Sequence, residues 1–96
     1  MNIKVLVKFV WDEDKERVIF SKHKVNFSTA QGAFFDPKRI IAIDEFHGEN
    51  EERYFCIGKT PSGICTVRFV YCDDTIRIFG AGFWRKGRKL YEKENR

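Results

Sequence analysis

The sequence lacks the residue patterns of a metal site and of a disulfide-stabilised domain. Its 96 residues include only two histidines and three cysteines, Cys56, Cys65 and Cys72. The cysteines are odd in number and do not have the spacing of metal ligands. We therefore expect reduced thiols that pack as small hydrophobic side chains in a cytoplasmic protein. We also expect no metal ion and no other cofactor.

Long hydrophobic runs, internal repeats, linkers and low-complexity tracts are also missing. The apolar start of the chain is interrupted by Lys4 and Lys8 and is too short to cross a bilayer, so we expect neither a signal peptide nor a membrane segment. A chain of 96 residues suits one modest hydrophobic core. We therefore predict a single domain that spans residues 1–96.

The sequence does have an uneven distribution of charge. The segment Arg85–Arg96 contains six basic and two acidic residues, and its net charge of +4 equals that of the whole chain. Residues 1–84 are therefore neutral overall. A basic end on a neutral body suits an acidic partner such as RNA, DNA or an acidic protein, although a run of like charge is more often only a solvated helix face.

Residues 53–82 have the pattern of three strands joined by two tight turns. Branched and aromatic residues dominate, and the turns fall at 60–63 and 73–74. The length of each turn fixes which residues lie opposite one another. The predicted pairs are Lys59 with Ile64, Cys56 with Val67, Arg53 with Val70, Cys72 with Thr75, Val70 with Arg77, and Phe69 with Ile78.

Alternation along these strands separates a core face from a charged face. The opposite side of the predicted sheet from the core carries Arg53, Arg68 and Arg77 on neighbouring strands, close enough to share one anion. Guanidinium groups suit bidentate contact with phosphate. Scattered charges on a solvated face explain the pattern equally well. The predicted core face consists of Tyr54, Cys56, Cys65, Val67, Phe69, Tyr71, Ile76 and Ile78.

The flanking segments complete an α+β pattern. Asp12 and Ser28 are suitable N-caps for two helices, and Gly80-Ala81-Gly82 is expected to loosen the backbone. We predict an α+β fold, in which a small antiparallel sheet has two N-terminal helices on one face and is followed by a C-terminal helix. In chain order we expect a strand at 2–11, helices at 13–22 and 28–34, a strand at 39–46, the three strands above and a helix at 86–93.

Several short motifs occur in an order and spacing similar to those of one protein family. They are Trp11-Asp12-Glu13-Asp14-Lys15, Lys22-His23, Val25 with Phe27, Phe35-Asp36-Pro37, Glu51-Glu52-Arg53-Tyr54, Ile57-Gly58, Thr75-Ile76-Arg77-Ile78 and Arg88-Lys89 with Tyr91-Glu92. Each is weak alone, but the ordered set covers about residues 9–92 and resembles the BrnT family. The resemblance implies a type II toxin with a RelE-like ribonuclease fold, which cleaves RNA and stops translation. It also implies a BrnA-like antitoxin with a ribbon-helix-helix-type DNA-binding part.

The chain departs from the family pattern after the last strand. The family usually has Ser-Ala-Arg where this chain has Gly80-Ala81-Gly82, so an arginine expected in the active site is missing. Arg85, three residues further on, is a candidate replacement, and reduced activity is the alternative. Arg53, Arg77 and Tyr91 match family positions, and His47 in the acidic loop does so more loosely.

RNA cleavage without a metal uses the 2′-hydroxyl as nucleophile. It needs a base for that hydroxyl, cations that stabilise the charged phosphorane and an acid for the leaving 5′-oxygen. The candidates for charge stabilisation are Arg53, Arg77 and Arg85. The candidates for proton transfer are His47, Tyr91 or a lysine.

The C-terminal segment supplies candidate RNA-binding residues. Aromatic rings stack on splayed bases and cations hold phosphates, a pattern suited to single-stranded RNA. Trp84 is equally suited to anchoring the last helix against the sheet. The candidate RNA-binding residues are Trp84, Lys86, Arg88, Lys89 and, from the sheet, Arg68.

We therefore predict a cytoplasmic, metal-independent endoribonuclease toxin. Its expected partners are an RNA substrate and a BrnA-like antitoxin. We expect it to contact operator DNA only through that antitoxin, and we expect no contact with a membrane. Two alternatives stay open. One is a non-catalytic RNA- or DNA-binding or co-repressor module with attenuated toxicity, and the other is a protein-interaction domain whose basic end docks an acidic antitoxin.

Overall fold

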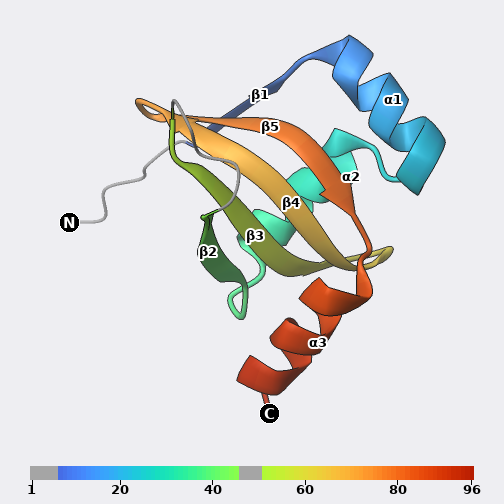
Figure 1. Ribbon diagram of the computed structural model, residues 1–96, viewed down its shortest axis with the longest axis vertical. Helices are drawn as coiled ribbons and strands as arrows, with labels where there is room; N and C mark the ends of the chain where they lie inside the picture. The colour runs from blue at the N-terminus through green and yellow to red at the C-terminus, as the bar shows by residue number, and fades with distance from the viewer. Residues whose placement is uncertain (1–6, 46–50) are drawn as a thin grey trace.

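The computed structural model describes residues 7–45 and 51–96 and shows the predicted α+β fold (Figure 1). Both turns of the central meander and the order of helices and strands agree with the sequence pattern. The elements are β1 (Lys8–Trp11), α1 (Glu13–His23), α2 (Phe27–Gln31), the 3-10 helix η1 (Gly32–Phe35), β2 (Ile40–Asp44), β3 (Arg53–Thr60), β4 (Gly63–Cys72), β5 (Thr75–Gly82) and α3 (Arg85–Glu94). Among the described residues, no helix is long and apolar enough to cross a membrane.

The five strands form one mixed sheet in the order β1-β5-β4-β3-β2. Strands β2 to β5 pair antiparallel, as predicted. Strand β1 pairs with β5 in parallel, so the predicted small sheet is mixed and mostly antiparallel. The sequence pattern could not place β1, because about two thirds of the chain separates it from its partner strand.

The register predicted from the two turns is confirmed, with one irregularity. Five of the predicted pairs occur as stated: Lys59 with Ile64, Cys56 with Val67, Cys72 with Thr75, Val70 with Arg77, and Phe69 with Ile78. The first turn is tighter than expected, because Thr60 pairs with Gly63 and leaves a two-residue loop. A bulge in β5 lies opposite the step from Arg68 to Phe69: Arg68 faces Gly80 while Phe69 faces Ile78, so Phe79 is the extra residue.

The core lies between one face of the sheet and the segment formed by α2 and η1, which passes behind the strands in Figure 1. Gly58 allows this close approach, since a Cβ there would lie 2.3 Å from the carbonyl oxygen of Ala33. Tyr71 belongs to the predicted core face but is 49% exposed, because no helix covers that end of β4. The fully buried side chains include Phe27, Ala30, Ala33, Cys56, Cys65, Val67 and Phe69.

Two helix starts show how local sequence positions the N-terminal helices. The Asp12 carboxylate accepts from the backbone N–H groups of Asp14 and Lys15, so the predicted cap of α1 is confirmed. The second helix begins earlier than expected. Its cap is Asn26, whose side chain accepts from the Thr29 N–H, and Ser28 already lies inside the helix.

Helix α3 packs on the opposite face of the sheet from α2. Its Gly87 lies against Thr66 and Ile57, which alternate with the core residues Val67 and Cys56 along their strands. The expectation that residues 80–82 loosen the backbone is wrong. They continue β5 as far as Gly82, which pairs with Thr66. We call this second face of the sheet the outer face.

Candidate functional site

Three cations from three different elements gather over one aromatic ring on the outer face. The side-chain cations of Arg53 (β3), Arg68 (β4) and Lys15 (α1) lie 4.9, 5.2 and 5.9 Å from the centroid of the Phe79 ring. The bulge in β5 places Phe79 here, between Ile78 and Ala81, which both point into the core. A ring face attracts cations, so Phe79 holds together charges that would otherwise repel one another. We call these four residues the Phe79 cluster.

Arg77 extends the Phe79 cluster along β5. It lies two residues before Phe79 on the same strand, and its guanidinium is 3.0 Å from the Glu51 carboxylate. Both side chains of this ion pair are about half exposed. The predicted row of three arginines therefore lies on one face of the sheet, as the alternation pattern indicated.

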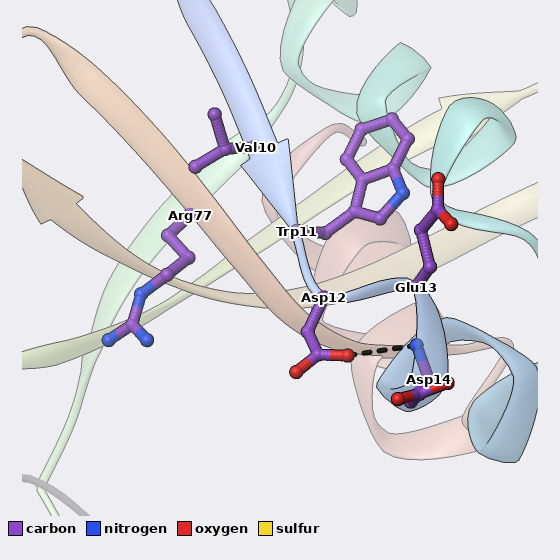
Figure 2. Close-up of a pocket in the computed structure, with 6 residues that line it drawn as sticks. All are labelled: Val10, Trp11, Asp12, Glu13, Asp14 and Arg77. Atoms are coloured by element: carbon purple, nitrogen blue, oxygen red, sulfur yellow. Dashed lines mark hydrogen bonds between the residues drawn. The ribbon is translucent and has the colours of Figure 1, made fainter.

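A hollow of about 530 Å³ lies beside Arg77, between β1 and the start of α1. Figure 2 shows the Arg77 guanidinium and the Asp12 carboxylate on the same side of the strands, with the Trp11 indole turned away from them. The acidic residues Asp12, Glu13 and Asp14 line this hollow too. A phosphate that reaches Arg77 is therefore better placed from the side of the Phe79 cluster than from this acidic side.

Arg68 is a partly buried cation of the Phe79 cluster. Its guanidinium lies 3.7 Å from the carboxylate of Asp44, a side chain that is 2% exposed. Its Nε is buried and has no hydrogen-bond partner within the described residues. Asp44 holds the Arg68 guanidinium in place, and the N–H groups that Asp44 does not engage can donate hydrogen bonds to an anion.

Tyr91 is not part of this group. Its hydroxyl donates to the Asp36 carboxylate at 2.5 Å, and the same carboxylate accepts from the backbone N–H groups of Lys59 and Lys38. The hydrogen bond to Asp36, together with burial, raises the pKa of Tyr91 to about 12. Lys59 is six residues along β3 from Arg53, or ~20 Å in an extended strand. The structure thus places Tyr91 at the other end of the sheet, where it joins α3 to the segment before β2.

The remaining C-terminal candidates lie on or beside α3. Arg85, Lys86, Arg88 and Lys89 are exposed, and Arg88 lies 3.7 Å from Glu92. They form a second basic surface, separated from the Phe79 cluster by a hollow described below. His47 lies outside the described residues.

Trp84 lies over Gly82, the position at which the resemblance led us to expect an arginine. A Cβ at Gly82 would lie 2.6 Å from the Trp84 ring, so the indole covers the position from which an arginine side chain would project. The same ring makes an edge contact with His23 at the end of α1, 5.2 Å between centroids. Trp84 therefore anchors the start of α3, and glycine at position 82 is what allows it to lie there.

Phe79, Lys15 and Asp44 are site residues that the candidate list from sequence did not contain. Lys15 belongs to α1, which follows the edge strand β1, and only the packing of α1 along β5 brings it over Phe79. Asp44 is the last residue of an apolar strand, opposite Arg53 in the β2–β3 ladder. The sequence offered one indication of Asp44, which is that an acidic residue stands at the end of an otherwise apolar strand.

A cationic face on a small basic α+β domain is suited to an anionic ligand. The comparison with protein families makes the assignment more specific. Residues 11–87 match the family described as the ribonuclease toxin, BrnT, of a type II toxin-antitoxin system. The chain belongs to this family, which confirms the resemblance noted in the sequence. A comparison with curated proteins found no match.

Proposed function

We propose that this chain is a metal-independent endoribonuclease whose reaction site is the Phe79 cluster together with Arg77. The observation that carries the proposal is the gathering of Lys15, Arg53 and Arg68 over one ring, with Arg77 beside it on the same face. Cleavage of RNA at this site stops translation and is the toxic activity.

The proposed reaction is attack of a ribose 2′-oxygen on the adjacent phosphorus. The new O2′–P bond forms as the P–O5′ bond breaks, the 2′-hydroxyl proton goes to a base, and the 5′-oxygen receives a proton from an acid. The products are a 2′,3′-cyclic phosphate and a 5′-hydroxyl. Arg53, Arg68 and Arg77 stabilise the extra negative charge on the phosphorane, the term that usually contributes most to catalysis.

Proton transfer needs a side chain other than arginine, because a guanidinium does not lose its proton in proteins. Lys15 is the member of the Phe79 cluster that can do so. Tyr91 is engaged by Asp36, so the proposed chemistry does not use it. Arg85 stays a candidate for charge stabilisation, and His47 stays a candidate for proton transfer.

Substitution of single arginines tests the proposal. We expect Arg77→Ala and Arg53→Ala to lower RNA cleavage by about 10²–10³-fold, the usual loss when one charge-stabilising donor is removed. Arg17→Ala is the matched control, since Arg17 lies exposed on α1 and pairs only with Asp14 among the described residues. Growth arrest after induced expression, and cleavage of purified RNA in the presence of EDTA, provide the measurements. Equal cleavage by all three variants would contradict the proposal.

A second function is favoured by one observation, the glycine at position 82 beneath Trp84. Without the family arginine, the chain can act as a non-catalytic RNA- or DNA-binding module that supports repression. In that case purified protein binds RNA and leaves it uncut at every concentration, while added salt weakens the binding steeply.

The proposal includes a protein antitoxin that keeps the toxin inactive in the cytoplasm. This partner is BrnA-like, and it carries the DNA-binding part through which the complex reaches its operator. The support is the family assignment, since a type II toxin has a cognate antitoxin.

A further inference from the structure

An apolar hollow separates the Phe79 cluster from the basic surface of α3. Its volume is about 440 Å³. It lies between α3 and the outer face of the sheet, beside the contact between Gly87 and Thr66. The walls are formed by Ala42, Phe55 and Ile57 from the sheet and by Trp84, Gly87 and Leu90 from the C-terminal segment.

The lining of this hollow argues against a polar occupant. Thr66 contributes its only hydroxyl, and that oxygen is buried against Gly87, where a Cβ would lie 2.0 Å away. A nucleobase in the hollow would lose the water bound to its polar edge and would meet mostly apolar side chains, with donors only on Trp84 and Lys86, which costs free energy. An apolar side chain loses nothing on entering. Leu90, a wall residue that is 38% exposed, would gain cover.

The rim of the hollow is positively charged. Lys86 lines one side, and α3 carries five cations and two carboxylates. On the other side Phe55 is the cross-strand partner of Arg68, so the Phe79 cluster begins one residue away from the wall. An occupant that fits has apolar side chains flanked by acidic ones.

We propose that the hollow receives an acidic amphipathic helix of the antitoxin. This inference rests on the proposed function, because it assigns the surface by which the toxin is neutralised. A groove between a sheet and a helix accepts apolar side chains spaced three or four residues apart on a partner helix. The acidic residues beside them pair with Lys86 on one side and with Arg68 on the other. A helix seated here covers the Phe79 cluster and excludes RNA.

Substitution of Leu90 tests the proposal without touching the reaction site. The full-length cognate antitoxin is titrated calorimetrically into toxin carrying Arg77→Ala, so that growth arrest does not limit preparation. We expect Leu90→Glu to weaken binding by about 30-fold or more, as for an interface hot spot. Val18→Glu is the control, because Val18 is an exposed apolar residue on α1, outside the hollow. We expect it to leave the affinity unchanged.

A second comparison tests the charge of the partner. Leu90→Lys also places a charged side chain in the hollow, but its charge is positive. Because the proposed partner is acidic, Leu90→Lys should weaken antitoxin binding less than Leu90→Glu does. Equal losses would overturn the acidic assignment. An unchanged affinity for Leu90→Glu would overturn the docking site itself.

The same variants are titrated with a short single-stranded RNA. If Leu90→Glu and Leu90→Lys both weaken RNA binding while antitoxin binding is unaffected, the hollow is a base-binding site and the proposal is wrong. Antitoxin affinity does not depend on RNA cleavage. Absence of cleavage by the parent chain would therefore contradict the proposed function and leave this inference standing.

Discussion

Asp36 shows how much of this fold depends on a single carboxylate. It accepts hydrogen bonds from Tyr91 on α3, from the backbone of Lys59 at the end of β3 and from that of Lys38. Burial raises the pKa of Asp36, but these hydrogen bonds outweigh it and the pKa lies below its ordinary value. The contact therefore stabilises the fold with Asp36 ionised and Tyr91 protonated.

Tyr91→Phe should lower the free energy of unfolding by about 1–2 kcal/mol at pH 8, since it removes a hydrogen bond to a charged group. The pKa of Tyr91 is raised to about 12 in the folded protein. The advantage of the parent over Tyr91→Phe is therefore full below pH ~10 and lost as the pH rises towards about 12. The pKa of Asp36 is lowered in the folded protein, so the advantage of the parent is also lost in acid, as the pH falls through the pKa of Asp36 in the folded state.

Urea unfolding across this pH range measures the difference. Tyr71→Phe is the control, because Tyr71 is half exposed and its hydroxyl makes no hydrogen bond to any of the residues that the structure describes. A difference between parent and Tyr91→Phe that does not change between pH 8 and 12 would show that the hydroxyl of Tyr91 is not bound to Asp36 in solution.

At the scale of elements, α3 is positioned by the absence of a side chain. Gly87 lies in the first turn of the helix, and glycine within a helix costs up to about 1 kcal/mol relative to alanine. The structure explains why it is there, since a Cβ would lie 2.0 Å from the Thr66 hydroxyl oxygen. Glycine at position 87 lowers the helix propensity of α3, but it allows the helix to approach the sheet closely.

Gly87→Ala should therefore destabilise the protein by about 1–3 kcal/mol, the cost of an overpacked contact, in spite of the better helix propensity. Thr66→Ala removes the atom that collides, and the oxygen it removes is buried and unpartnered. In that background Gly87→Ala should become neutral or stabilising. Thermal unfolding of the two single variants and the double variant forms the test. Equal losses in both backgrounds would mean that α3 is not held at Thr66.

At the scale of the whole molecule, the charges form two basic surfaces, on the Phe79 cluster and on α3, separated by an apolar hollow. The first surface could not be seen in the charge of residues 1–84, which is zero. It arises because folding collects cations on one face and leaves acidic residues, such as Asp12, Glu13 and Asp14, at its margin. Single-stranded RNA that binds across this face releases the counterions of each neutralised phosphate.

The affinity for a single-stranded RNA should fall linearly with salt on a double-logarithmic plot. The slope is about −0.7 for each phosphate neutralised. Arg77→Ala should make the slope shallower by about 0.7, whereas Arg17→Ala should leave it unchanged. Fluorescence anisotropy at salt concentrations of roughly 50–200 mM measures the slope. A slope that does not differ between parent and Arg77→Ala would place the phosphate elsewhere.

The sequence by itself determined the meander, its register and the side of the sheet on which the arginines lie. These features depend on alternation and turn length, which are local and act over a few residues. The caps of α1 and the boundaries of α3 are local in the same way. The family could also be identified from the sequence, because each of its motifs is a short local pattern and their order can be followed along the chain.

Tertiary structure decided which distant residues meet. The parallel pairing of β1 with β5, the approach of Lys15 to Phe79 and the engagement of Tyr91 by Asp36 all join residues that are far apart in the chain. The bulge that turns Phe79 outward depends on how β4 and β5 twist together. Contacts of this kind follow from how whole elements pack, and no short pattern encodes them.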